Sequence, residues 1–236
     1  MPENVRVWVE IIFNISYLLV IWGLVLRMTQ RRGSVAEADR GVANRLRWAF
    51  ALLALGDTGH VGFRVVAYAL GGLEANPALV GLGALSTAYT VTLFYMLLVD
   101  VWRLRFQRSL GWFGWLLLAA GAVRMLLMAF PQNQWQLIVP PYDWSLLRNA
   151  FLVLQGLGVM ALFFRDSART GDRTFTAVAR MIALSFAFYT PVILWVGQVP
   201  LLGMLMIPKT CAYIAVAVIA YRSLYPRRTA LETKPA

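Results

Sequence analysis

Residues 201–221 read LLGMLMIPKTCAYIAVAVIAY, an apolar stretch with one charged residue near its middle, Lys209. A run of this length can cross the hydrocarbon core of a bilayer, which is about 30 Å thick. At a rise of about 1.5 Å per residue from Pro200, Lys209 lies about 13 Å along the segment, close to the midplane. The stretch therefore predicts a membrane-spanning helix with a lysine inside it.

Similar apolar runs recur along the whole chain of 236 residues. Hydrophobic residues make up 60% of it and charged residues 14%, whereas an ordinary soluble domain is about 45–50% apolar. We predict an all-α integral membrane protein, a seven-transmembrane-helix bundle over residues 1–225 with a cytoplasmic tail at 226–236. The predicted spans are 5–27, 46–71, 77–101, 112–130, 144–164, 177–198 and 200–222.

Most basic residues lie in alternate connections of this bundle. The loops after the first, third and fifth predicted helices and the tail are rich in arginine, whereas the other three loops contain no lysine or arginine. Cytoplasmic loops of membrane proteins carry such an excess. The pattern predicts an amino terminus outside and a carboxyl terminus in the cytoplasm, in the cell (inner) membrane. The net charge of +11 is therefore a topology signal, with contact to anionic lipid of the bilayer as a further interpretation, and we expect no nucleic-acid partner.

A second group of ionisable residues falls inside the predicted spans. Such residues cost about 2.5–3.5 kcal/mol each on insertion scales and usually face the bundle interior. The helical rise predicts a midplane layer and an outer layer. The midplane layer contains Asp57, His60 and Lys209. The outer layer contains Glu10, Arg64, Arg124 and Arg148. Uncharged side chains expected beside them are Ser86, Thr90, Asn149 and Tyr189.

These residues predict a polar site that opens toward the outside and carries more cations than the acids Glu10 and Asp57 can neutralise. We expect it to bind a small anionic or lipid-like ligand, in a transporter or a receptor-like sensor. The alternative is that the buried charges pair with one another and only hold helices together.

Enzymatic chemistry is the weaker interpretation of the same residues. One histidine and one cysteine cannot supply the usual nitrogen and sulfur ligands of a zinc site, so we predict no metal site. Ser86, His60 and Asp57 could form a triad acting on a lipid, but the sequence has no nucleophile elbow. We therefore assign no catalytic residue, and the residues identify no cofactor.

Five strings resemble a family of bacterial seven-helix membrane proteins for which no activity is established. They are GDTGHVGFR (56–64), STAYTVTLFYMLL (86–98), RNAFLVL (148–154), LSFAFYTPVILW (184–195) and PLLGMLMIPKTCAY (200–213). The shared patterns are G-D-x-x-H-x-x-x-R, S-x-x-x-T-x-x-x-F-Y-x-L-L and P-K-T-C-A-Y. The resemblance implies that Asp57, His60, Arg64, Arg148 and Lys209 act as one set.

The chain is also loosely similar to microbial rhodopsins, which have seven helices and carry retinal on a lysine midway along the seventh. That similarity implies a Schiff base on Lys209, whose desolvated amine would be a suitable nucleophile. Leu205 stands where the rhodopsins have an acid four residues before their lysine. Asp100 falls at the end of helix 3 rather than in mid-span, so Asp57 would have to serve as the counterion.

Overall fold

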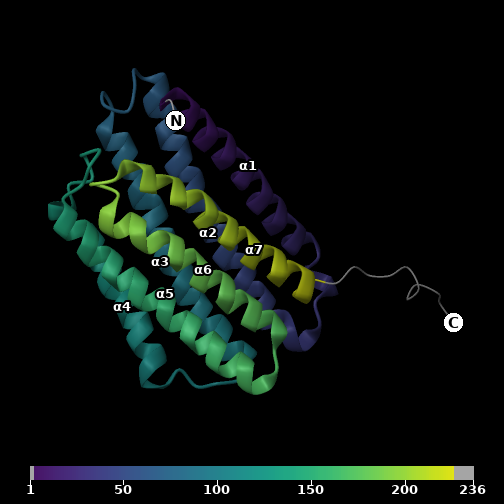
Figure 1. The fold of residues 1–236 in the computed structure, drawn as a ribbon. Helices are drawn as coiled ribbons and strands as arrows, with labels where there is room; N and C mark the ends of the chain where they lie inside the picture. Colours follow the sequence, from purple (N-terminus) through teal and green to yellow (C-terminus); the bar gives the residue numbers. More distant parts are fainter. Residues whose placement is uncertain (1–2, 226–236) are drawn as a thin grey trace.

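The computed structural model describes the backbone of residues 3–225 and the side chains of Val9 and of residues 11–225. These residues fold as an up-and-down bundle of seven long helices joined by short connections (Figure 1). The long helices are α1 (Glu3–Gln30), α2 (Arg40–Ala69), α3 (Pro77–Arg105), α4 (Gly111–Ala129), α5 (Tyr142–Thr170), α6 (Arg173–Trp195) and α7 (Met206–Leu224). Short 3₁₀ helices are η1 (Arg32–Ser34), η2 (Glu37–Asp39), η3 (Pro131–Asn133) and η4 (Pro200–Leu205). The predicted tail 226–236 lies outside the described residues.

The helices pack in chain order around a closed ring, because α1 contacts both α2 and α7. The most extensive contact joins α2 to α3, and α3 also touches α4 and α5. The largest fully buried side chains are aromatic or aliphatic, among them Phe50, Phe94, Tyr95 and Phe163. The core therefore runs through the middle of the ring.

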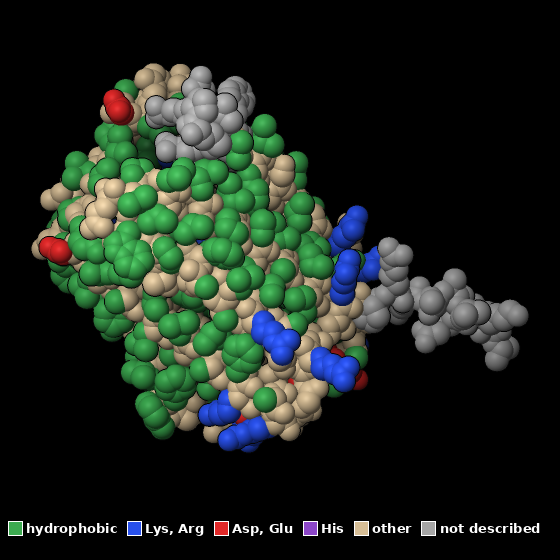
Figure 2. Space-filling model, viewed as in Figure 1, with side chains coloured by type: hydrophobic (Ala, Val, Ile, Leu, Met, Phe, Trp, Pro, Cys, Tyr) green, Lys and Arg blue, Asp and Glu red, His purple; other side chains and the backbone are tan. Residues whose placement is uncertain are grey.

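The outside of the bundle is apolar, which distinguishes it from a soluble protein. Large hydrophobic side chains such as Ile15, Leu19, Trp115 and Leu126 are exposed along the helices. Figure 2 shows hydrophobic side chains over the middle of the molecule and arginines gathered at one end. In the described part of the chain, seven segments are long and apolar enough to cross a membrane, the seventh combining η4 with α7. The prediction of an all-helical bundle with seven candidate spans is confirmed.

The predicted helix ends needed correction where arginines are dense. α2 begins at Arg40 rather than at residue 46, α3 continues to Arg105, and α5 continues to Thr170 rather than ending at 164. Arginine is a good helix former, so these helices extend past the apolar segment that defined the predicted span.

The start of the seventh span also differs from the prediction. The predicted helix 200–222 begins as the 3₁₀ segment η4, and α7 starts only at Met206. Pro208 lies in the first turn of α7, where its missing N–H leaves no helical hydrogen bond unmade. It therefore marks a helix start rather than a kink within a helix.

Ion pairs join the helices at the end where the arginines gather, which we call the arginine-rich end. Arg105 of α3 contacts Asp39 at 2.5 Å and Asp172 at 2.8 Å. Asp166 of α5 is fully buried and accepts hydrogen bonds from Trp102 Nε1 at 2.8 Å and Arg165 Nη2 at 2.7 Å. These contacts connect η2, α3, α5 and the α5–α6 turn, so this end of the bundle is held by paired charges.

Small residues allow α2 and α3 to approach closely. A Cβ atom at Gly56 would collide with Thr90, and one at Gly59 would lie 2.6 Å from Ser86 Oγ. No atom outside the helix lies within 4 Å of a Cβ placed at Gly62. Gly56 and Gly59 are therefore required by packing, whereas Gly62 is not.

Candidate functional site

Asp57 of α2 connects three helices. Tyr17 of α1 donates its hydroxyl to Asp57 Oδ2 at 2.6 Å, and Thr87 of α3 donates to Oδ1 at 2.7 Å. Each carboxylate oxygen therefore has its own donor. Hydrogen bonds to an ionised acceptor are roughly twice as strong as neutral ones. Tyr17 and Thr87 were not among the residues predicted from the sequence.

Ser86 and Thr90, predicted to lie beside the charged residues, pack against α2. Both side chains meet the glycine surface of α2, Thr90 at Gly56 and Ser86 at Gly59. The Thr90 hydroxyl donates back to the Ser86 carbonyl of its own helix at 3.1 Å. They share a face of α3 that packs on α2, and both side chains stay partly exposed, so their part in a ligand site stays a prediction.

His60 and Arg64 follow Asp57 on α2, and both are partly buried. His60 Nδ1 is enclosed and has no hydrogen-bond partner among the described residues. Arg64 makes no hydrogen bond or ion pair with any residue that the structure describes. Asp57, His60 and Ser86 are not hydrogen-bonded to one another, so the triad considered from the sequence is not assembled. The predicted contribution of Glu10 falls on a side chain outside the described residues.

Lys209 lies against two tyrosine rings. Its Nζ is 4.7 Å from the ring centroid of Tyr189 and 5.4 Å from that of Tyr213. Both distances are within the range of a cation–π interaction. Lys209 forms no ion pair with any described carboxylate, and the site that it was predicted to share with Asp57 and His60 stays a prediction.

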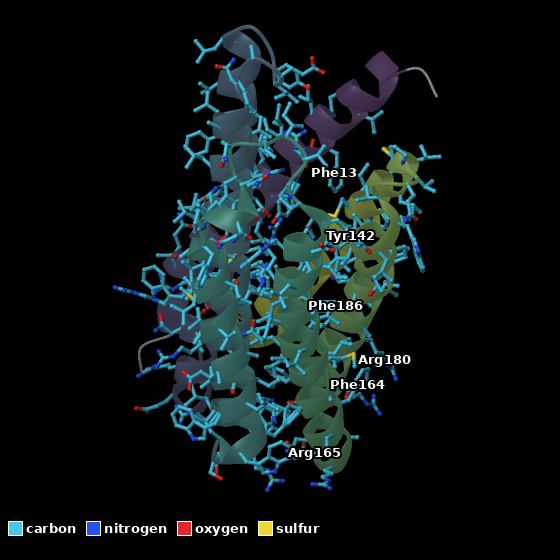
Figure 3. All side chains as sticks on the ribbon, turned by 90° about the vertical axis from the view of Figure 1, so that its left-hand side faces the viewer. Phe13, Tyr142, Phe164, Arg165, Arg180 and Phe186 are labelled. Atoms are coloured by element: carbon cyan, nitrogen blue, oxygen red, sulfur yellow. The ribbon has the colours of Figure 1, made fainter. Side chains whose placement is uncertain are left out.

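The tyrosines around Lys209 are themselves tied to other helices. The Tyr213 and Tyr95 hydroxyls share a hydrogen bond of 2.5 Å, and Tyr189 donates to Asn149 Oδ1 at 3.2 Å. Phe186 packs on Tyr95 with ring centroids 5.7 Å apart. Figure 3 labels Phe186 between Tyr142 and Arg180 along the bundle, and its side chain is buried. Lys209 and Tyr189, both predicted and both partly buried, therefore lie in an aromatic layer of α3, α6 and α7.

Arg124 of α4 is buried, with only 2% of its surface exposed. Its Nε donates to the Arg148 carbonyl at 2.9 Å, and its Nη1 donates to the Ala88 carbonyl at 2.8 Å and to Thr92 Oγ1. All three acceptors are uncharged. No described residue accepts a hydrogen bond from Nη2, although a guanidinium has five N–H donors. Arg124 thus joins α3, α4 and α5, and it forms no ion pair with a carboxylate of the described residues.

Arg148 of α5 holds the connection between α4 and α5, residues 130–141. Its Nη1 donates to Asn133 Oδ1 at 2.9 Å, and its guanidinium stacks over the Trp135 ring at 4.5 Å. The Trp135 backbone packs so closely on α3 that a Cβ at Gly81 would collide with its carbonyl. The 130–141 connection thus contacts α3, α4 and α5 at this end, and the predicted outward opening of the site stays a prediction.

The sequence contained usable signals for some partners that were missed. Tyr213 follows Lys209 by four residues, which puts both on one face of a helix. Thr87 was missed because α3 carries hydroxyls on several faces, Ser86 and Thr90 among them. The rotation of the helix about its axis, which decides the hydroxyl that meets Asp57, is not visible in the sequence. Asn133 lies in an irregular connection, where no periodicity predicts which side chain turns inward.

The fold and this interior define a multi-pass helical membrane protein with cationic side chains buried between its helices. No protein-family model, curated protein or solved structure matches the chain. The family resemblance drawn from the sequence motifs therefore stays a prediction.

Proposed function

We propose that the chain binds a small anionic or lipid-like ligand at the layer formed by Arg124 and Lys209, as a transporter or a receptor-like sensor. One observation carries the proposal. Arg124, Arg148 and Lys209 lie inside the bundle, and none of them forms an ion pair with a carboxylate of the described residues. The carboxylate of Asp57, which was predicted to lie in the same layer as Lys209, instead accepts hydrogen bonds from Tyr17 and Thr87.

The charge balance supports a ligand more than a closed structural network. Neutral carbonyls and aromatic rings solvate a cation but do not neutralise it, and isolated buried charges are costly. Arg124 and Lys209 lie close enough for their positive charges to repel each other, so one anionic group between them would compensate both. The aromatic rings of Tyr95, Phe186 and Tyr189 would suit an apolar portion of the same ligand.

The ligand proposal is tested by the mass of the purified protein under native and then denaturing conditions. Wild type should retain an anionic adduct that is lost on denaturation. Arg124→Met and Lys209→Met should lose it while eluting as folded protein, and Arg32→Gln, at an exposed position of η1, should keep it. Equal retention by Arg124→Met and wild type would remove the basis of the proposal.

A Schiff-base protein of the retinal type is the second candidate, and the contact of Lys209 with two tyrosine rings favours it. A lysine amine condenses with an aldehyde to give an imine and water. The same masses decide between the candidates. After borohydride reduction, an adduct that survives denaturation and is absent from Lys209→Met would support the covalent reading.

We further propose that the amino terminus faces outside and the carboxyl terminus faces the cytoplasm of the cell (inner) membrane. The support is the arginine-rich end, which collects the connections after α1, α3 and α5. In a Cys211→Ser background, an impermeant maleimide should label Glu74→Cys in intact cells. It should label Ala36→Cys only after permeabilisation, and the reverse pattern would invert the orientation.

A further inference from the structure

A cleft of about 410 Å³ lies between α5 and α6 at the arginine-rich end. It is lined by Ser167, Ala168, Gly171, Arg173, Thr176 and Arg180. It is separate from the interior layer around Lys209, and none of its residues was assigned a role above. A neighbouring cleft of about 560 Å³ shares Gly171 and Arg173 with it and extends toward Arg105.

The two clefts differ in charge. In the neighbouring cleft, Arg105 is already paired with Asp39 and Asp172. In the α5–α6 cleft, Arg173 and Arg180 have no ion-pair partner among the residues that the structure describes. The acids closest in sequence, Asp166 and Asp172, have other partners. Asp166 is buried and pairs with Arg165, and Asp172 accepts hydrogen bonds from Arg105 and from the Phe175 N–H. The α5–α6 cleft therefore carries two uncompensated positive charges.

The spacing of its polar groups suits a phosphate. Arg173 and Arg180 are seven residues apart on α6, which puts them on one face and about 10 Å apart along the axis. Thr176 lies between them and donates its hydroxyl to Ser167 Oγ at 2.9 Å. Arginine is well matched to phosphate oxygens because its planar N–H groups can bind two of them together.

The position of Arg180 identifies the source of that phosphate as a lipid. Arg180 is exposed on the side of the bundle, although it lies within the candidate span Arg173–Trp195 (Figure 3). A long cationic side chain at this depth reaches toward the headgroup region. One turn further into the span, Leu184 is 42% exposed, so an apolar surface follows the arginines along α6.

We propose that the α5–α6 cleft binds the phosphate of an anionic phospholipid, with its acyl chains along the exposed apolar surface of α6. Basic pockets between transmembrane helices bind such headgroups in other membrane proteins. The site is independent of the ligand proposed for Arg124 and Lys209, because it shares no residue with that layer.

The test measures retention of dimyristoylphosphatidylglycerol by the detergent-purified chain in native mass spectrometry, with dimyristoylphosphatidylcholine as the zwitterionic comparison. Wild type should retain the phosphatidylglycerol selectively. The double variant Arg173→Gln/Arg180→Gln should bind it roughly 30-fold more weakly, from two basic residues near the surface. Arg32→Gln/Arg222→Gln removes two exposed arginines of the same end outside the cleft and should change binding less than threefold.

Three outcomes would overturn the proposal. Undiminished binding by Arg173→Gln/Arg180→Gln would place the lipid elsewhere, and an equal loss in the control pair would reduce the effect to general surface charge. Displacement of the lipid by millimolar inorganic phosphate would make the cleft a soluble-anion site. Elution of each variant as a monodisperse species shows that a loss does not come from unfolding. Lys209→Met should keep the phosphatidylglycerol, which separates this site from the interior one.

Discussion

Replacing Arg124 by lysine should destabilise the protein more than replacing it by methionine, although lysine keeps the positive charge. The guanidinium reaches two helices at once, bonding the Arg148 carbonyl on α5 and the Ala88 carbonyl and Thr92 hydroxyl on α3. An ammonium is a compact point charge on a flexible stem and cannot span the same acceptors. Lysine would therefore leave a buried charge with fewer partners.

The size of the effect follows from the contacts. Two lost hydrogen bonds from a charged donor are worth about 3–6 kcal/mol on soluble-protein values and about 1 kcal/mol on the average for membrane helices. We therefore expect Arg124→Lys to lower the free energy of unfolding by about 3 kcal/mol. Methionine leaves no orphaned carbonyl, because Ala88 and Arg148 lie inside α3 and α5 and keep their intrahelical donors. It also removes the cost of burying a charge, so Arg124→Met should cost about 1 kcal/mol.

Fluorescence-detected size-exclusion chromatography after heating ranks the three proteins, and titration with dodecyl sulfate gives the free energies. The matched control replaces the exposed Arg32 by lysine and by methionine, and both changes should be neutral there. If Arg124→Lys proves as stable as wild type, or more stable than Arg124→Met, then the two-helix geometry of the guanidinium is not what stabilises this position.

Three further predictions concern packing, hydrogen bonding and pH. Gly56→Leu should destabilise the bundle by about 1–3 kcal/mol, because no space exists between α2 and α3, while Gly62→Leu should be tolerated; thermal midpoints of the two variants test this contrast. Tyr17→Phe and Asp57→Asn should each lower the free energy of unfolding, and the double variant should lose about 1 kcal/mol less than the sum of the two single losses in a double-mutant cycle. Strictly additive losses would contradict a stabilising hydrogen bond at 2.6 Å. Burial raises the pKa of Tyr225 to about 12 from its usual 10.0, so its stabilising contribution is complete below pH 10 and is lost as the pH rises toward 12. Tyr225→Phe should remove that part of the alkaline loss, and an unchanged difference in stability between the two proteins from pH 9 to pH 12 would refute it.

The fold was largely predictable because the bilayer imposes simple constraints on sequence. Each span must be apolar for about 20 residues, and the connections carry glycine, proline or arginine. Helix ends were less predictable at Arg40 of α2 and Arg169 of α5. Arginine is common in the headgroup region beyond an apolar span and is also a good helix former, so its presence does not mark where the helix stops. The prediction therefore located the apolar spans better than the helices that contain them.

The sequence predicted which charged residues lie between the helices but could not predict their contacts, and the ligand site that they were predicted to form stays a prediction. A charged residue inside an apolar span is visible in the sequence, and Arg124, Arg148 and Lys209 were identified in that way. Which partner each charge meets depends on the rotation of every helix about its axis. The aromatic surroundings of Lys209, the use of Thr87 rather than Ser86 and the binding of Arg148 to Asn133 all depend on those rotations.

The close contact between α2 and α3 has a consequence for biosynthesis. The pair is consecutive in the chain, joined by residues 70–76, and its glycine surface needs no other helix to complete it. At about 5–20 residues per second, synthesis of residues 106–225 takes on the order of 10 s after α3 has left the ribosome. During that interval the α2–α3 hairpin can assemble in the bilayer and bury the Asp57 carboxylate against Thr87. The later helices would then dock onto a preformed template, with α3 offering its remaining faces to α4 and α5.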